Sequence, residues 1–106
     1  MQPYDLLLTP TMATTAFNAG AMRPTELAGK PMASPGDWTP FCEPFNLTGQ
    51  PAATIPCGFA TNGLPIGLQI VGRWHGDATV LRAAAAYEDA TPWHDQRPVL
   101  DDAPAA

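Results

Sequence analysis

Two stretches near the middle of the chain have the apolar pattern of a β-hairpin. Apolar and small residues predominate at positions 52–59 and 66–71, and the dipeptide Asn62-Gly63 lies between them. Asn and Gly tolerate the positive φ angles of a hairpin loop, so this dipeptide is typical of such a turn. We therefore predict an antiparallel pair of strands joined by a loop of about six residues.

Neither face of the second strand in this pair is strongly polar. Side chains alternate at period two, which separates Ile66, Leu68 and Ile70 from Gly67, Gln69 and Val71. A strand of this kind normally lies inside a sheet that is covered on both sides. The chain offers little such covering, because Leu, Ile, Val and Phe make up under a fifth of it. Residues 1–106 are therefore interpreted as a single partial domain.

A short apolar run at residues 4–9 predicts one further strand, which Pro10 ends. It contains three consecutive leucines, so both of its faces are expected to need covering. Residues 11–39 show little periodicity and contain a proline or glycine every few positions, which indicates a long loop. Loops of this length in compact domains are usually functional or disordered. The tail at residues 99–106 is expected to be disordered.

An alanine-rich helix is predicted over residues 78–90. Asp77 precedes it and is expected to cap the free N–H groups of the first turn, and Pro92 prevents further extension. The face expected to lie against the sheet consists of Val80, Leu81, Ala84 and Tyr87. The small alanine side chains allow a close approach between this helix and the sheet.

Charge and composition exclude several classes of function. The net charge is −5 and the five basic residues are scattered, whereas nucleic-acid binding needs cations gathered on one face. No apolar run approaches the roughly 18 residues of a membrane span, and no signal-peptide pattern opens the sequence. Cys42 and Cys57 are interpreted as half-buried free thiols. We therefore expect a cytoplasmic protein that binds neither nucleic acid nor membrane.

Two motifs flank the first predicted strand. The sequence Asn-Leu-Thr-Gly-Gln-Pro occupies positions 46–51, and Gly-Leu-Pro-Ile-Gly-Leu-Gln occupies positions 63–69. Together with the run Asp-Leu-Leu-Leu-Thr-Pro-Thr at 5–11 and the helical stretch at 77–89, they resemble the C-terminal portion of the amidase signature family, which includes amidases and proteins like the A subunit of glutamyl-tRNA amidotransferase. The resemblance covers roughly residues 4–98.

The resemblance implies an α/β fold, namely a fragment of the family's mixed sheet with a β-hairpin, one further strand and a following helix. Within the first motif, Asn46 and Thr48 are expected to bond the backbone in a turn, Gly49 to take unusual backbone angles and Pro51 to stiffen the start of the strand. The full set of structural motif residues is Asn46, Gly49, Pro51, Asn62, Gly63, Gly67 and Gln69.

The family cleaves amide carbon–nitrogen bonds with a serine nucleophile, a second serine whose peptide bond is cis, and a lysine that accepts the proton. This sequence contains one serine, Ser34, and one lysine, Lys30. Prolines beside both residues disfavour a helix that would join them as a dyad. A set of Cys57, His75 and Asp77 is imaginable, but a core cysteine and a surface histidine are favoured. No catalytic residue, metal site or cofactor is therefore assigned.

Three aromatic residues, Trp38, Phe41 and Phe45, precede the first motif. They either pack an irregular segment against the hairpin or line an acyl or aryl pocket. The resemblance also places the loop at 11–39 toward the substrate pocket. If the aromatics have the second role, Trp38, Phe41 and Phe45 form part of the wall of that pocket.

Two functions remain open. The main hypothesis is the C-terminal part of an amidase, inactive alone, that completes the sheet and walls the substrate site. The alternative is a stand-alone, non-catalytic interaction or oligomerisation module derived from the amidase fold. In both, unpaired strand edges predict self-association or association with the missing N-terminal part of an amidase. Within the family, the imperfect placement of Asp37 favours a general amidase over the glutamine-hydrolysing component of transamidosomes.

Overall fold

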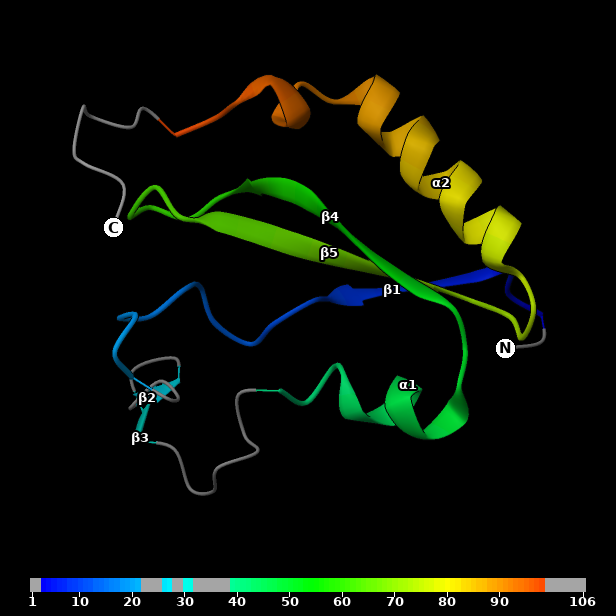
Figure 1. The fold of residues 1–106 in the computed structure, drawn as a ribbon, viewed down its shortest axis with the longest axis horizontal. Coiled ribbons are helices and arrows are strands. Elements are labelled where there is room, and N and C mark those ends of the chain that lie inside the picture. Colours follow the sequence, from blue (N-terminus) through cyan, green and yellow to red (C-terminus); the bar gives the residue numbers. More distant parts are fainter. Residues whose placement is uncertain (1–2, 22–25, 28–29, 32–38, 99–106) are drawn as a thin grey trace.

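A computed structural model describes residues 3–21, 26–27, 30–31 and 39–98. The elements in chain order are β1 (Leu6–Pro10), β2 (Glu26–Leu27), β3 (Lys30–Pro31), α1 (Glu43–Thr48), β4 (Ala52–Phe59), β5 (Pro65–Gly72), α2 (Asp77–Ala90) and the 3₁₀-helix η1 (Trp93–Asp95). A three-stranded antiparallel sheet of order β1-β5-β4 forms the centre, with α2 over one face and α1 below the other (Figure 1). The predicted tail at 99–106 lies outside the described residues.

The predicted β-hairpin is confirmed. β4 and β5 pair antiparallel from Ala52 opposite Val71 to Phe59 opposite Pro65. Residues 60–64 form the loop, in which Gly63 has a φ of 85° and the Leu64 N–H donates to Asn62 Oδ1 at 3.1 Å. A shift in register between Pro56 and Gly58 leaves Cys57 in a bulge of β4.

The further strand, β1, pairs with the other side of β5, so β5 is the central strand. The register runs from Leu6 opposite Gly72 to Pro10 opposite Leu68. Within the described residues, the outer edges of β1 and β4 have no partner strand. Leu7 and Leu8 are 43% and 57% exposed, so the covering that this leucine run was expected to need is incomplete. The loop at 11–39 contains the two-residue ladder of β2 and β3.

The buried core lies at the end of β5, where Ile70 shares the α2 side of the sheet with Gly72 and Val71 faces the opposite side. Its hydrophobic residues are Ile70, Val71 and Val80, of which Val71 is completely buried. The prediction that Leu81 faces the sheet is wrong, since this side chain is 65% exposed. Leu81 is one residue beyond Val80, which turns it about 100° around the helix. Ala84 lies one helical turn beyond Val80 and is half-buried.

The helix α2 begins one residue earlier than predicted. Asp77 is its first residue, Gly76 occupies the N-cap position, and no described side chain caps the helix. The prediction that Asp77 caps the first turn is therefore wrong, although its carboxylate still lies near the positive end of the helix dipole. At the other end, Thr91 Oγ1 donates to the Tyr87 carbonyl at 2.9 Å.

The short helix α1 replaces the irregular segment and turn that the sequence predicted. Pro44 lies in its first turn, where the missing N–H costs nothing. Gly49 ends the helix in the left-handed conformation, with a φ of 73°, and its N–H donates to the Phe45 carbonyl at 2.9 Å. Asn46 and Thr48 are thus helical residues, and the Gln50 N–H lies 3.5 Å from Thr48 Oγ1.

Candidate functional site

The sheet face opposite α2 carries a row of polar side chains. The strand register aligns Thr9 of β1, Gln69 of β5 and Thr54 of β4 at one level across the sheet. Just beyond β1, the Thr11 and Thr54 hydroxyls share a hydrogen bond that passes over Gly67. A Cβ atom on Gly67 would lie 2.8 Å from Thr11 Oγ1, so only glycine allows this contact without a shift.

Gln69 is the buried member of this row, with 7% of its surface exposed. Its Nε2 donates to Thr9 Oγ1 and to the Phe41 carbonyl, both at 2.9 Å. Thr9 Oγ1 in turn donates to the Pro10 carbonyl at 2.9 Å. The amide therefore joins β1, β5 and the segment that leads into α1.

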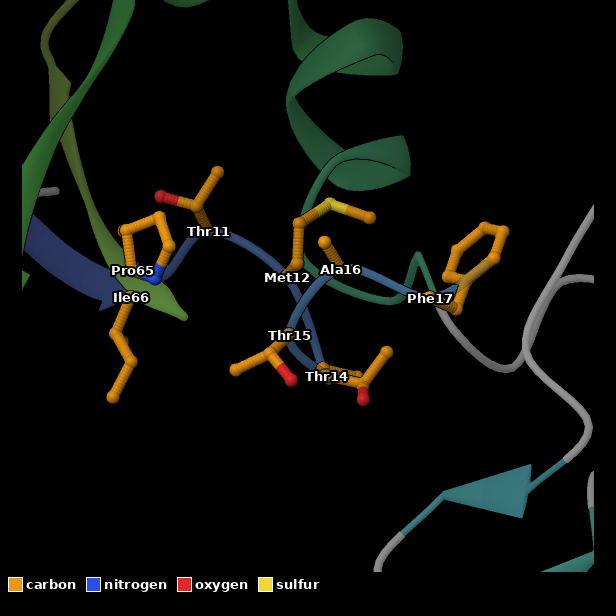
Figure 2. Close-up of a pocket in the computed structure, with 10 residues that line it drawn as sticks. Thr11, Met12, Thr14, Thr15, Ala16, Phe17, Pro65 and Ile66 are labelled. Carbon is orange, nitrogen blue, oxygen red and sulfur yellow. The ribbon is translucent and has the colours of Figure 1, made fainter. Parts of the chain in front are cut away.

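A hollow of about 460 Å³ opens beside this face, between the chain that follows β1 and the start of β5. In Figure 2, Pro65 and Ile66 lie on one side, and Phe17 lies at the far end of the loop. Its ten described lining residues are Thr11, Met12, Ala13, Thr14, Thr15, Ala16, Phe17, Pro65, Ile66 and Gly67. These residues combine apolar side chains with three threonine hydroxyls, and none of them is titratable. The hollow is suited to holding an apolar group rather than to proton transfer.

The predicted pocket wall and the hollow are formed by different parts of the chain. Phe41 and Phe45 are half-buried in and before α1, and neither is among the described residues that line the hollow. Trp38 lies outside the described residues. Phe17 is the aromatic residue of the described lining, and sequence analysis did not single it out. Its only signal was its size within a run of small threonines and alanines.

The α1 segment is nevertheless in contact with the hollow's wall. Cys42 Sγ lies 3.6 Å from the Thr11 carbonyl and 4.0 Å from Met12 Sδ. In Figure 2 the Met12 side chain extends toward the α1 ribbon. The residues that lead into α1 therefore support Thr11 and Met12 from outside the hollow.

Three further hydrogen bonds fix the C-terminal end of α1 to the end of β5. The Trp74 indole N–H donates to the Thr48 carbonyl at 2.6 Å, and Gln50 Nε2 donates to the Gly72 carbonyl at 3.0 Å. The Gly72 N–H donates to the Pro51 carbonyl at 2.9 Å. The first motif thus contacts β5 through backbone and side-chain hydrogen bonds.

The other imaginable catalytic set is separated by the fold. Cys57 lies in the bulge opposite the start of β5, whereas His75 and Asp77 follow the end of that strand. Ser34 lies outside the described residues, and Lys30 belongs to β3. Across the described ranges, no three His, Cys, Asp or Glu side chains gather as metal ligands would. None of the helices described there has the length and apolar character of a membrane span.

Comparison with known proteins decides the family. The family model described as Amidase matches residues 1–81. The chain belongs to the Amidase family. It is 46% identical to the A subunit of glutamyl-tRNA(Gln) amidotransferase from Moorella thermoacetica over 93% of this chain and 19% of that protein. It is 41% identical to an acylamidase of Rhodococcus erythropolis over 92% of this chain and 20% of that protein.

Solved structures of the Amidase family share the fold as well. The 6-aminohexanoate cyclic dimer hydrolase superposes with a TM-score of 0.74 at 35% identity, over 90% of this chain and 21% of that one. A bacterial aryl acylamidase of the amidase signature family superposes with a TM-score of 0.72 at 32% identity, over 92% and 21%. The family and fold predicted from the two motifs are confirmed. The chain spans about a fifth of the length of these relatives.

Proposed function

We propose that this chain is the C-terminal part of an amide carbon–nitrogen hydrolase and supplies part of its substrate-binding wall. The observation that carries the proposal is the hollow of about 460 Å³ formed by residues 11–17 and 65–67 in a chain of the Amidase family. Its apolar lining and threonine hydroxyls match the acyl or aryl portion of an amide substrate. The aryl acylamidase and acylamidase relatives support this class of substrate.

Under this proposal the chain has no amidase activity by itself. Amide hydrolysis by a serine enzyme needs an activated nucleophile and donors for the oxyanion. The family's serine pair cannot be drawn from Ser34 alone, and no described residue that lines the hollow is titratable. Under this proposal the catalytic groups come from another segment of the enzyme.

A chimera tests the proposal. The segment of the Rhodococcus erythropolis acylamidase that matches this chain is replaced by residues 1–106, and hydrolysis of an acyl anilide is measured. We expect the chimera to turn over and the chain alone to be inactive. A chimera without the acylamidase's catalytic serine serves as the blank. A chimera that unfolds cooperatively but shows no turnover would count against the proposal, as would turnover by the purified chain.

The wall itself is tested by substitution within that chimera. Phe17→Ala is expected to raise KM for an acyl anilide several-fold, because the aromatic ring is lost from the lining. Phe41→Ala and Phe45→Ala compare the wall predicted from sequence with the hollow seen in the structure. Leu47→Ala is the matched control, since Leu47 is 90% exposed on α1. If all four substitutions change KM equally, the hollow does not form part of the substrate-binding wall.

A second candidate function is a non-catalytic module that associates with itself. The open edge of β1 among the described strands and the exposed Leu7 and Leu8 favour it. An edge of unpaired N–H and C=O groups beside apolar side chains is a template for strand pairing. A chain that dimerises and fails to restore activity in the chimera would favour this module over the hydrolase part.

We also infer that the protein acts in the cytoplasm. Cys42 and Cys57 are both free thiols and both half-buried. Free thiols are the usual state in reducing compartments, where disulfides are rare. Fractionation of cells that produce the tagged protein tests this location.

A further inference from the structure

Gln69 is a buried amide at the junction of β1, β5 and the residues that lead into α1. It is 7% exposed, and its Nε2 donates hydrogen bonds to two other segments. We propose that Gln69 is a positioning residue, which holds the Phe41 carbonyl and thereby fixes the wall of the hollow. The inference rests on the proposed function, because it assigns a role to a residue that does not line the hollow itself.

The path from Gln69 to the hollow has two steps. Nε2 donates to the Phe41 carbonyl at 2.9 Å, which fixes the peptide unit that joins Phe41 to Cys42. Cys42 Sγ then lies 3.6 Å from the Thr11 carbonyl and 4.0 Å from Met12 Sδ. Thr11 and Met12 line the hollow. Displacement of the Phe41 carbonyl therefore removes the support behind these two residues.

The chemistry of the junction requires an amide of this length. Both acceptors, Thr9 Oγ1 and the Phe41 carbonyl, need a donor, and one NH₂ group provides two N–H bonds. A methionine of similar size would fill the space but donate to neither acceptor; the Thr9 hydroxyl would keep its bond to the Pro10 carbonyl, whereas the half-buried Phe41 carbonyl would lose the Gln69 donor. Asparagine is one methylene shorter, so its NH₂ group cannot span the same two contacts.

The two ends of α1 are held by different side chains, so loss of the Gln69 contact should loosen only the N-terminal end. Trp74 holds the C-terminal end through the Thr48 carbonyl at 2.6 Å, and Gln69 holds the segment before the N-terminal end. When the Gln69 contact is lost, the Trp74 contact remains. Residues 39–46 should then loosen while residues 47–51 stay protected.

The full 106-residue chain carrying Gln69→Met is compared with the parent by hydrogen exchange and by thiol labelling of Cys42 in a Cys57→Ala background. We expect exchange in residues 39–46 and the Cys42 labelling rate to rise by roughly three- to tenfold. Exchange in the hairpin loop at 60–64 should stay within about twofold of the parent. If Gln69→Met does not fold, Gln69→Asn provides the same comparison with a smaller rise.

Two matched variants separate positioning from general destabilisation. Thr9→Val removes the other acceptor and leaves the Phe41 contact, so residues 39–46 should keep their protection. Ile70→Val weakens packing in the buried core, and any rise in exchange should extend over the whole sheet. The assignment would be overturned if exchange in Gln69→Met rose uniformly over the chain. It would also be overturned if exchange in residues 39–46 rose as much in Thr9→Val as in Gln69→Met.

The chimera adds a functional measurement. Gln69→Met should raise KM for the acyl anilide by about twofold or more, with kcat within about twofold, because binding rather than chemistry is affected. A fall in kcat at unchanged KM would overturn the positioning role. If the parent chimera is inactive, the proposed function fails, but the exchange pattern of the isolated chain still decides the role of Gln69.

Discussion

Gly72 at the end of β5 is the point at which we expect a single methyl group to be most costly. An ideal Cβ on this residue would lie 2.5 Å from Val80 Cγ2 of α2 and 3.5 Å from the Gly76 carbonyl oxygen. Val80 is 2% exposed and β-branched, so its helical rotamer is nearly fixed and it cannot turn away. Gly72→Ala must therefore displace α2 or the strand, at a cost of about 1–3 kcal/mol of unfolding free energy.

A double-mutant cycle isolates this contact. Val80→Ala alone removes two buried methyl groups, each worth about 0.8 kcal/mol, and leaves a small cavity, so we expect a loss of about 2 kcal/mol. In the double variant, the methyl group added at position 72 takes the space that the valine side chain vacated. The double variant should then lose about 2 kcal/mol, well below the sum of the single losses, which is a coupling of about 1–3 kcal/mol.

Urea unfolding followed by tryptophan fluorescence measures all three variants at about 25 °C. Gly20→Ala is the matched control, because a Cβ at Gly20 would meet nothing within 4 Å. It should change the unfolding free energy by less than about 0.5 kcal/mol. Strictly additive losses, or a neutral Gly72→Ala, would show that α2 does not rest on Gly72 in solution.

Three other predictions concern the loop, the chemistry and the assembly. Gly63→Val should cost about 1 kcal/mol or more of unfolding free energy because Gly63 has a φ of 85°, and an unchanged melting temperature would contradict it. The purified chain should show no amide turnover above buffer; activity that survives repurification and is lost in Ser34→Ala or Cys57→Ala would contradict it. Light scattering should give the mass of a dimer, whose interface we expect to bury on the order of 1,000 Å² or more. Leu8→Lys on β1 should lower the measured mass toward that of the monomer. A monomer at high concentration with cooperative unfolding would mean that the chain covers its own core.

The hairpin and α2 could be predicted because their signals are local. Asn62 and Gly63 define the loop through their own backbone preferences, and Pro92 limits the helix. The two motifs identified the family for the same reason, as each is a contiguous run. The errors in α2 are small shifts along a helix, since Leu81 lies one position from the buried Val80.

Helix α1 and the hollow could not be predicted in this way. Six residues that include Pro44 are too few to form a stable helix from propensity alone. The helix persists because Trp74 and Gln69 bind the carbonyls at and before its ends, and both lie far along the chain. The hollow likewise joins residues 11–17 to residues 65–67, which only the pairing of β1 with β5 brings together.

The pairing of β1 with β5 also determines the order in which the sheet can assemble. Phe59 and Pro65 meet across a short loop, whereas Leu6 and Gly72 are paired although they lie near opposite ends of the stretch from β1 to β5. Contacts of large sequence separation form late because their loop-closure entropy is paid first. β1 is therefore expected to join the sheet last and to detach first. While β1 is detached, the edge of β5 that pairs with it has no partner strand. The β1 of a second molecule has the same register available to it, so we expect the rate at which β1 detaches to limit any exchange of strands between two copies.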